Sequence, residues 1–128
     1  MKFEKQIILV TAATRGIGLA TVKAAAQEGA TVYMAARDMD RARELTRQMD
    51  SMGWRVHCVY NDATKPETFQ TMVDEVIKNE GRIDTLVNNF GYSDPKVDLD
   101  IAHTKPEDFL KIVELNVRSV FMASQAAI

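Results

Sequence analysis

Short apolar segments alternate with segments of helical periodicity along the chain, and this alternation restricts the possible folds more than any other feature of the sequence. Runs rich in Val, Ile, Leu and Tyr predict strands at 6–10, 31–35, 55–60 and 84–88. Between these runs, apolar residues recur at spacings of three and four, which is typical of helices with one buried face. Strands and helices in this order form a parallel sheet that helices cover on both faces. The sequence therefore predicts an α/β fold.

The ends of the predicted helices carry local signals of their own. Gly29, Gly53 and Gly81 each stand where a helix would end in a left-handed residue before the next strand. The tetrapeptide TKPE occurs at 64–67 and again at 104–107. Each copy places a threonine three residues before a glutamate, with a proline between them, which is the pattern of a capping box. We expect both copies to open helices.

The composition and the charge exclude several classes of function. The chain has 16 basic and 18 acidic residues and a net charge of −2, so no basic surface for nucleic acid is expected. No apolar run approaches the roughly 20 residues that a membrane span needs. Cys58 is the single cysteine, which excludes an intrachain disulfide, and the first residues lack a signal-peptide pattern. We expect a cytoplasmic protein in which residues 1–128 form one domain.

The segment TAATRGIG, residues 11–18, follows the first predicted strand and leads into a helix. In a parallel sheet, ligands bind beyond the carboxyl ends of the strands, where the strand order reverses. The first N–H groups of a helix attract anions, and Gly16 and Gly18 have no side chain to block a pyrophosphate. The complete G-x-G-x-x-G fingerprint is nevertheless absent. Two interpretations stay open at this point, a phosphate-binding turn and an ordinary tight turn.

Four motifs in order give the chain a resemblance to a known family. TAATRGIG resembles the T-G-x-x-x-G-x-G turn of the short-chain dehydrogenase/reductase family, with Ala12 in place of the first glycine. LVNNFG at 86–91 resembles the N-N-A-G motif of that family, with Phe90 in place of alanine. DAT at 62–64 stands where the family holds the adenine ring, and LNV at 115–117 matches the helix that carries its catalytic asparagine. Together the motifs extend over nearly the whole chain.

This resemblance implies a Rossmann-type doubly wound parallel sheet, of which the chain would hold the amino-terminal half, about four strands and four helices. It also implies that a nicotinamide dinucleotide binds. The residues that the resemblance places at this cofactor are Thr11, Thr14, Arg15, Gly16, Ile17, Gly18, Asp62, Ala63, Asn89 and Gly91. Asn88 and Asn89 could instead simply cap the fourth strand.

The end of the second predicted strand bears on which nicotinamide cofactor binds. An acidic residue there would bond the ribose 2′-hydroxyl of NAD and repel a 2′-phosphate. This chain has Ala36 followed by Arg37, and Arg15 lies in the glycine turn close to the same pocket of such a fold. Two guanidinium groups suit a phosphate dianion, so we predict NADP(H). The alternative is that both arginines are solvated surface residues, and Asp38 adds an acid nearby.

Asn116 is the candidate catalytic residue of the chain. It lies in line with an apolar stripe of the last predicted helix. The stripe consists of Phe109, Ile112, Val113, Val117, Val120 and Phe121. A buried amide needs hydrogen-bond partners, so Asn116 could simply bond neighbouring backbone and hold the helix. The resemblance implies that it also orders the water of a proton relay.

The other catalytic groups of the family have no match. The family supplies an acidic tyrosine in a Y-x-x-x-K pattern, preceded by a serine that polarises the carbonyl. Tyr92 and Lys96 have this spacing, but Pro95 lies between them and argues against the helix that carries the pair in the family. The chain therefore resembles the cofactor half of a dehydrogenase, and we expect it to be inactive by itself.

Two longer segments, EGRIDTLVNNFG and VRSVFMASQAAI, are similar to bacterial bile-acid 7α-hydroxysteroid dehydrogenases. This finer resemblance implies a parent oxidoreductase that acts on a secondary alcohol or ketone, a hydroxysteroid or bile acid. Two alternatives stay open: a non-catalytic NADP(H)-binding sensor, and a structural fragment that assembles through its apolar last helix. We expect a homo-oligomer, because the fourth strand could expose an unpaired edge, and no nucleic-acid or membrane partner. His57 and His103 have no metal-ligand spacing, so no metal is expected.

Overall fold

The computed structural model describes residues 1–128 and contains four strands and four helices in strict alternation. In chain order these are β1 (Ile7–Val10), α1 (Gly16–Gln27), β2 (Thr31–Ala36), α2 (Met39–Asp50), β3 (Arg55–Tyr60), α3 (Glu67–Glu80), β4 (Thr85–Val87) and α4 (Pro106–Ala127). Each strand lies within one residue of its predicted bounds, because a run of β-branched and aromatic residues between turn residues is a strong local signal. The predicted α/β fold is confirmed.

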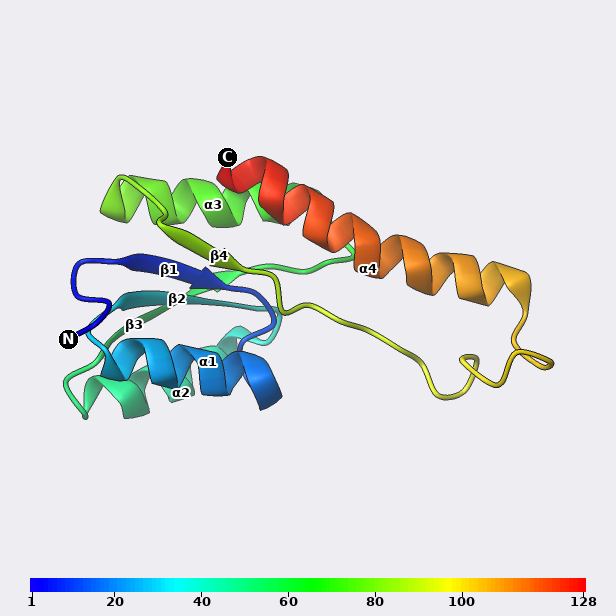
Figure 1. Ribbon diagram of the computed structural model, residues 1–128, viewed down its shortest axis with the longest axis horizontal. Helices are drawn as coiled ribbons and strands as arrows, with labels where there is room; N and C mark the ends of the chain where they lie inside the picture. Colours follow the sequence, from blue (N-terminus) through cyan, green and yellow to red (C-terminus); the bar gives the residue numbers. More distant parts are fainter.

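All four strands are parallel and stand in the order β3-β2-β1-β4 (Figure 1). The chain thus starts in the middle of the sheet, moves outward through β2 and β3, and then crosses to the other side of β1. The strand order reverses between β1 and β4, where Ile8 pairs with both Val32 and Thr85. In a doubly wound sheet this reversal leaves a crevice beyond the carboxyl ends of the strands. The loops after β1, β2, β3 and β4 all border that end of the sheet.

The core has two layers, one on each face of the sheet (Figure 1). Successive residues of a strand point to opposite faces. Ile7 and Leu9 of β1 therefore pack with α3 and with Ala123 of α4. Ile8 and Val10 pack with α1 and α2 on the opposite face. Both faces of a parallel sheet need such a cover, which explains why the central strands β1 and β2 are buried at every position.

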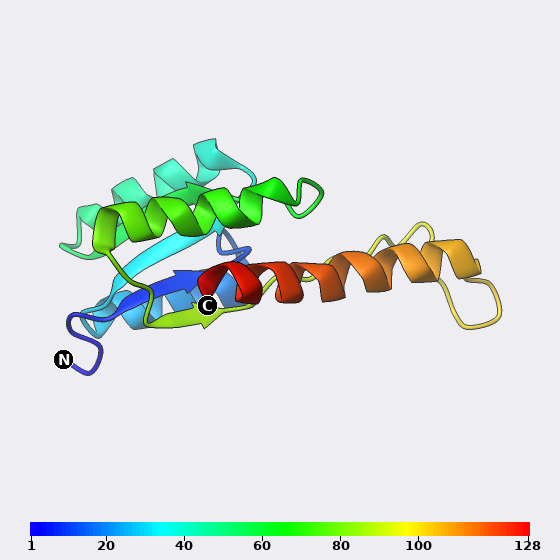
Figure 2. The same cartoon turned by 90° about the horizontal axis from the view of Figure 1, so that it is seen from above.

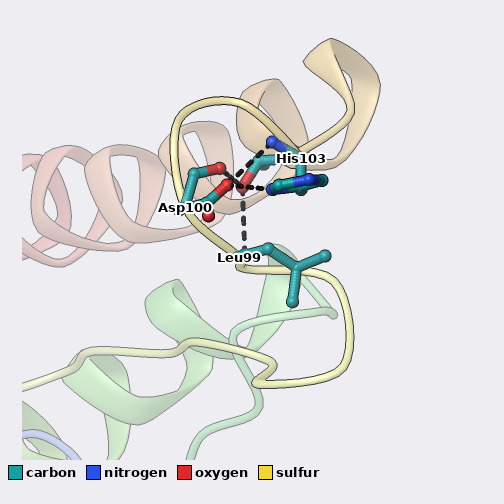
Figure 3. Close-up of polar contacts among 4 residues, drawn as sticks. Leu99, Asp100 and His103 are labelled. Atoms are coloured by element: carbon teal, nitrogen blue, oxygen red, sulfur yellow. Dashed lines mark hydrogen bonds and ion pairs between the residues drawn. The ribbon is translucent and has the colours of Figure 1, made fainter.

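The capping-box prediction for the two TKPE segments is wrong. Neither α3 nor α4 has a side-chain cap, and the helices begin after Pro66 and Lys105 rather than after the threonines. The Thr64 hydroxyl instead donates to the Asp62 carboxylate at 2.7 Å. The hydroxyl of Thr104 bonds the backbone of Leu99 and Asp100, in a turn that the contact between Asp100 and His103 also closes (Figure 3). Both threonine hydroxyls bond nearby loop atoms, so they do not cap the first N–H groups of the helices.

The last helix, α4, is the longest and packs on the sheet only through its carboxyl-terminal part. Its first turns and the preceding segment 92–105 extend beyond the sheet (Figure 2). Ser119 and Ala123 are buried, whereas Phe109, Val117 and Phe121 of the predicted apolar stripe are 57%, 63% and 63% exposed. Leu115 and Met122 also pack against the core, whereas the exposed large apolar residues of this stripe face outward. No helix of the protein combines the length and apolar character that crossing a membrane requires.

Candidate functional site

The turn after β1 is fixed to both neighbouring strands. Beyond the end of β1, Thr11 N–H donates to the carbonyl oxygen of Val87 at 3.1 Å, and Ala13 N–H donates to that of Ala35 at 3.1 Å. The Thr11 hydroxyl is buried and accepts the backbone N–H groups of Asn89 and Phe90, at 3.0 and 3.2 Å. Thr11 thus joins the loops after β1 and β4 across the point where the strand order reverses.

Gly16 and Gly18 serve different steric needs at the start of α1. Gly16 has a φ of +58°, the left-handed conformation that glycine adopts without strain, and a β-carbon there would face open space. Gly18 is buried, and a β-carbon there would lie 2.5 Å from the side-chain nitrogen of Asn89 and 2.6 Å from the carbonyl oxygen of Ala12. Gly18 is therefore required by packing within the protein, whereas Gly16 leaves an open surface above the turn.

The first N–H groups of α1 point to no acceptor within the protein. Arg15 is the N-cap residue, and its side chain makes no capping bond. The backbone N–H groups of Gly16, Ile17 and Gly18 donate to no carbonyl or side-chain oxygen of the chain. Gly16 and Ile17 are exposed, so the start of the helix borders solvent. Free N–H donors at a helix start, together with the helix dipole, form an anion site that fits a pyrophosphate.

Ala12, which stands where the family has a glycine, also adopts the left-handed conformation, with a φ of +50°. A residue with a β-carbon is strained there by roughly 1–2 kcal/mol. The Ala12 carbonyl oxygen accepts the Asn89 side-chain amide at 3.0 Å. The turn therefore keeps the backbone path that glycine would allow, and the contact to Asn89 holds the strained residue in place.

The loop after β2 carries the charged residues of the site. Arg37 is exposed, and its charge contributes to the low pKa of Asp62 in the next loop. Asp38 is the N-cap of α2, and its carboxylate accepts the Arg41 N–H at 3.1 Å. The guanidinium of Arg41 in turn donates from Nε to the carbonyl oxygen of Thr14 at 3.0 Å. Arg41 thus connects the glycine turn to α2, a role that the sequence did not reveal.

The segment Asp62–Thr64 follows β3 and is held by several hydrogen bonds. The Asp62 carboxylate accepts the hydroxyl of Thr64 at 2.7 Å and its N–H at 2.9 Å. These bonds, the Thr64 hydroxyl first, lower the pKa of Asp62, with smaller help from the cations of Lys65 and Arg37. Ala63 is 7% exposed, so only a small part of it can touch a ligand. The loop is thus ordered and carries an ionised carboxylate.

Asn116 holds the backbone that follows Gly91 by hydrogen bonds. Its side-chain oxygen accepts the N–H of Tyr92 at 2.9 Å, and its side-chain nitrogen donates to the carbonyl oxygens of Tyr92 and Ile112 at 2.9 and 2.8 Å. The structural role considered from the sequence, bonding neighbouring backbone, is confirmed. A β-carbon on Gly91 would make only an ordinary contact with Asn116, at 3.7 Å.

Two further sequence-based expectations concern aromatic residues near this loop. Phe90, which stands where the family has alanine, could narrow the cofactor pocket, but it packs against the core layer beneath α3 and α4. Its backbone N–H donates to the Thr11 hydroxyl at 3.2 Å. Tyr92 and Lys96 lie in a segment without helix, as Pro95 predicted, so their spacing does not form a helical pair.

The site residues therefore form one group at the carboxyl ends of the strands, and the structure adds residues that sequence reasoning missed. Arg41 fixes the glycine turn, and the buried Thr68 hydroxyl accepts the N–H of Asp62 at 3.0 Å. A surface cavity of about 530 Å³ lies elsewhere, between α2 and the first residues of β3. Its lining includes Arg43, Arg47 and Trp54, none of which borders the glycine turn.

Comparison with known proteins gives consistent matches at the level of sequence. A model of the short chain dehydrogenase family matches residues 6–128. The 7alpha-hydroxysteroid dehydrogenase of Paraclostridium sordellii is 41% identical over 127 residues, which cover 99% of this chain and 48% of that protein. The cyclopentanol dehydrogenase of Comamonas testosteroni is 32% identical over 123 residues, which cover 96% of this chain and 48% of that protein. The chain spans about half the length of the curated relatives it matches.

Solved structures agree with these relatives. The crystal structure of gox2181 matches with a TM-score of 0.90 at 30% identity, over 98% of this chain and 48% of that chain. A gluconate 5-dehydrogenase from Burkholderia cenocepacia, in complex with NADP and tartrate, matches with a TM-score of 0.85 at 26% identity, over 98% of this chain and 49% of that chain. Both solved structures thus share the four-stranded sheet and its helices.

Proposed function

Because the chain belongs to the short chain dehydrogenase family, we propose that residues 1–128 form one dinucleotide-binding unit, the NADP(H)-binding part of an oxidoreductase. The family uses nicotinamide cofactors, and a bound nicotinamide supplies or accepts the hydride that interconverts an alcohol and a ketone. The observation that carries the proposal is the start of α1. Three backbone N–H groups there lack acceptors, and no atom lies near the position of a Gly16 β-carbon. These donors suit the two phosphates that join the halves of a dinucleotide.

The preference for NADP(H) rests on the loop after β2. Asp38 is the acid nearest the strand end, and its carboxylate is engaged as the α2 cap by the Arg41 N–H. Arg37 and Arg15 are exposed, and neither makes an ion pair within the protein. An acid already bonded within the protein and two free guanidinium groups favour a 2′-phosphate over a ribose hydroxyl.

The other contacts follow from the loops at the same edge of the sheet. In the proposal, Thr14, Ile17 and Gly18 border the phosphates through the turn, while Asp62 and Ala63 face the adenine. Asn89 and Gly91 border the ribose on the nicotinamide side, and the buried Thr11 holds the Asn89 backbone beside the turn. Asn116 orders a water of the proton relay. Its side chain already makes three backbone bonds, so it would act through the backbone that it fixes.

The substrate that we propose is a cyclic secondary alcohol or its ketone, with a hydroxysteroid or bile acid as the first candidate. The support is the 41% identity to a 7alpha-hydroxysteroid dehydrogenase and the 32% identity to a cyclopentanol dehydrogenase. Residues 1–128 offer no tyrosine–lysine pair on a helix. We therefore propose that this segment alone does not turn over. Oxidation of a 7α-hydroxylated bile acid and of cyclopentanol, assayed with the protein as its source produces it, tests the substrate class.

The cofactor proposal is tested by the charge of Arg37. With the protein as its source produces it, we expect Arg37→Asp to weaken NADPH binding by tenfold or more, while the affinity for NADH stays equal or rises. Arg55→Asp makes the same change of charge on β3, away from the glycine turn, and should leave the ratio of the two affinities unchanged. The dissociation constants can be measured from nicotinamide fluorescence. An unaltered ratio in Arg37→Asp would refute the NADP(H) preference, and failure of the unmodified protein to bind either nucleotide would refute the cofactor site.

A second proposal concerns self-association. Several large apolar residues of α4 are exposed, with Phe109, Val117 and Phe121 all more than half exposed. Exposed apolar surface of this kind is typical of a protein–protein interface. We propose that the protein is a homo-oligomer that buries this face. Sedimentation velocity over a hundredfold range of concentration tests this, and a monomer at every concentration would contradict it.

A further inference from the structure

Arg118 of α4 reaches across the protein to the loop after β3. One terminal nitrogen of its guanidinium, Nη2, donates to the carbonyl oxygen of Ala63 at 3.2 Å. The other, Nη1, lies 3.5 Å from the carboxylate of Glu114, one turn earlier on the same helix. The Nε–H is buried and has no hydrogen-bond partner. Arg118 is therefore neither a solvated surface arginine nor a fully satisfied core residue.

The Arg118 side chain keeps its hydrogen bond to Ala63, although its Nε–H is then buried without a hydrogen-bond partner. A buried N–H without a hydrogen-bond partner is unfavourable. Without another contact, the side chain would therefore turn its Nε toward water. Its side chain is 33% exposed, so an outward conformation lies within reach. The inward conformation is nevertheless kept, and the bond that it gains is the one to Ala63. The contact also joins residues that are 55 positions apart in the chain.

The loop that receives this bond is otherwise held by the Asn61 N–H, which donates to the Ala36 carbonyl oxygen of β2 at 3.0 Å, by its own residues and by the start of α3. The Thr68 hydroxyl, at the start of α3, accepts the N–H of Asp62 at 3.0 Å and lies 2.9 Å from its carbonyl oxygen. Thr64 bonds the Asp62 carboxylate. Neither of these residues bonds Ala63 itself. The Thr64 N–H of the same peptide group bonds the Asp62 carboxylate, and Arg118 holds the Ala63 carbonyl on the other side. This second restraint comes from α4, the helix that also fixes Tyr92 through Asn116.

We propose that Arg118 is a positioning residue for the adenosine half of the cofactor. By holding the Ala63 carbonyl toward α4, it fixes the orientation of the Ala63–Thr64 peptide and, with it, the position of Ala63 in the surface offered to the adenine. The proposal rests on the proposed function, since it needs a dinucleotide whose adenosine lies at this loop. It makes α4 a common support for two loops of the site, with Arg118 acting on the one after β3 and Asn116 on the one after β4.

The test compares ligands that represent the two halves of the cofactor, with the protein as its source produces it. The probes are 2′,5′-ADP for the adenosine half, reduced nicotinamide mononucleotide for the other half, and NADPH, all measured by isothermal titration calorimetry. We expect Arg118→Met to weaken 2′,5′-ADP and NADPH by the same factor, about tenfold, because one bond to a charged donor is lost. The mononucleotide should bind as before. Arg118→Lys keeps the charge and should recover part of the loss.

Two controls on the same helix separate positioning from charge and from helix stability. Lys111→Met removes an exposed positive charge that makes no ion pair, and Glu114→Gln removes the ion partner of Arg118 while leaving its bond to Ala63. Both should bind 2′,5′-ADP like the unmodified protein. Circular dichroism checks that each variant is folded. If Arg118→Met does not fold, the same binding measurements are made on Arg118→Lys, which should still bind 2′,5′-ADP more weakly than the unmodified protein does.

The outcomes distinguish this inference from the proposed function. If the unmodified protein binds NADPH and Arg118→Met binds 2′,5′-ADP equally well, the inference is wrong and the cofactor site stands. If Arg118→Met weakens the mononucleotide as much as 2′,5′-ADP, the residue supports the whole fold and the positioning role is refuted. If the unmodified protein binds neither NADPH nor 2′,5′-ADP, the proposed function fails, and the inference fails with it.

Discussion

Gly18 of α1 and Asn89 of the loop after β4 approach so closely that a β-carbon on Gly18 would lie 2.5 Å from the Asn89 side-chain nitrogen. The same β-carbon would lie 2.6 Å from the carbonyl oxygen of Ala12, which accepts that nitrogen at 3.0 Å. Three segments therefore meet at a point with no room for a side chain. The second glycine of the turn is explained by packing across the place where the strand order reverses, before any ligand is considered.

We expect Gly18→Ala to lower the free energy of unfolding by about 2–3 kcal/mol, because the Ala12 carbonyl belongs to the backbone and cannot move aside cheaply. Gly16→Ala is the matched control in the same turn. It meets no neighbour, and only its left-handed φ is strained, so its cost should be about 1 kcal/mol. Urea unfolding of both variants gives the comparison, and equal losses would contradict the packing explanation.

At Ala12, a change from alanine to glycine tests the same turn in the opposite direction. Its φ of +50° is strained for a residue with a β-carbon, whereas glycine adopts it freely. Glycine also loses more chain entropy on folding, by about 0.4–1 kcal/mol. We expect Ala12→Gly to stabilise the protein by a few tenths to about 1 kcal/mol in thermal or urea unfolding. Ala24→Gly, at an exposed position within α1, should instead destabilise by about 1 kcal/mol, and a loss of stability in both would show that Ala12 is not strained.

The sequence predicted the parts of this structure that local patterns determine. The four strands, their parallel arrangement and the turn with Gly16 and Gly18 follow from apolar runs, strand–helix alternation and glycines in the right order. The repeated TKPE segment shows where a local pattern is insufficient. Its two threonines have the right neighbours in sequence, but Asp62 and Asp100 compete for their hydroxyls, and both helices begin without a side-chain cap.

The residues that sequence reasoning missed act over long separations in the chain. Arg41 bonds Thr14 across 27 residues, and Arg118 bonds Ala63 across 55. Each is an arginine on a helix with charged neighbours, which is the usual appearance of a solvated surface residue. Only the packing of the helices against the sheet decides which of the 16 basic residues reaches a loop of the site. No spacing rule within one helix could have selected them.

Asp84 makes the stability of the protein depend on pH in the acidic range. Its carboxylate accepts the N–H of Ile7 at 2.8 Å, which joins the start of β1 to the start of β4, and lies 3.0 Å from Arg82. The bond from Ile7 first, and then that from Arg82, lowers the pKa of Asp84. The folded state therefore favours the ionised form. Its stabilising effect is complete above the ordinary carboxyl pKa of about 4 and is lost as the pH falls through the lower folded value.

We expect Asp84→Asn to be less stable than the unmodified protein at pH 7, and the difference to shrink toward zero as the pH falls below about 3. Urea unfolding at a series of pH values measures this convergence. Asp74→Asn is the control at pH 7, because Asp74 bonds only the side chain of Gln70 on the exposed face of α3, and its effect should be smaller. A difference between Asp84→Asn and the unmodified protein that stays constant down to pH 2.5 would show that the carboxylate charge is not responsible.

Asn116 holds the backbone at Tyr92 by two bonds, and their removal should be visible at that residue. Asn116→Leu keeps a similar volume but cannot accept the Tyr92 N–H or donate to its carbonyl oxygen. We expect the Tyr92 amide to exchange its hydrogen at least tenfold faster, with a loss of about 1–2 kcal/mol in overall stability. Asn88→Leu is the control at the end of β4, since Asn88 bonds only the Ser124 hydroxyl. Hydrogen exchange followed by NMR resolves the single amide. If Tyr92 exchanges at the same rate in both variants, the loop is held by its own conformation, and α4 does not position the backbone beside Gly91.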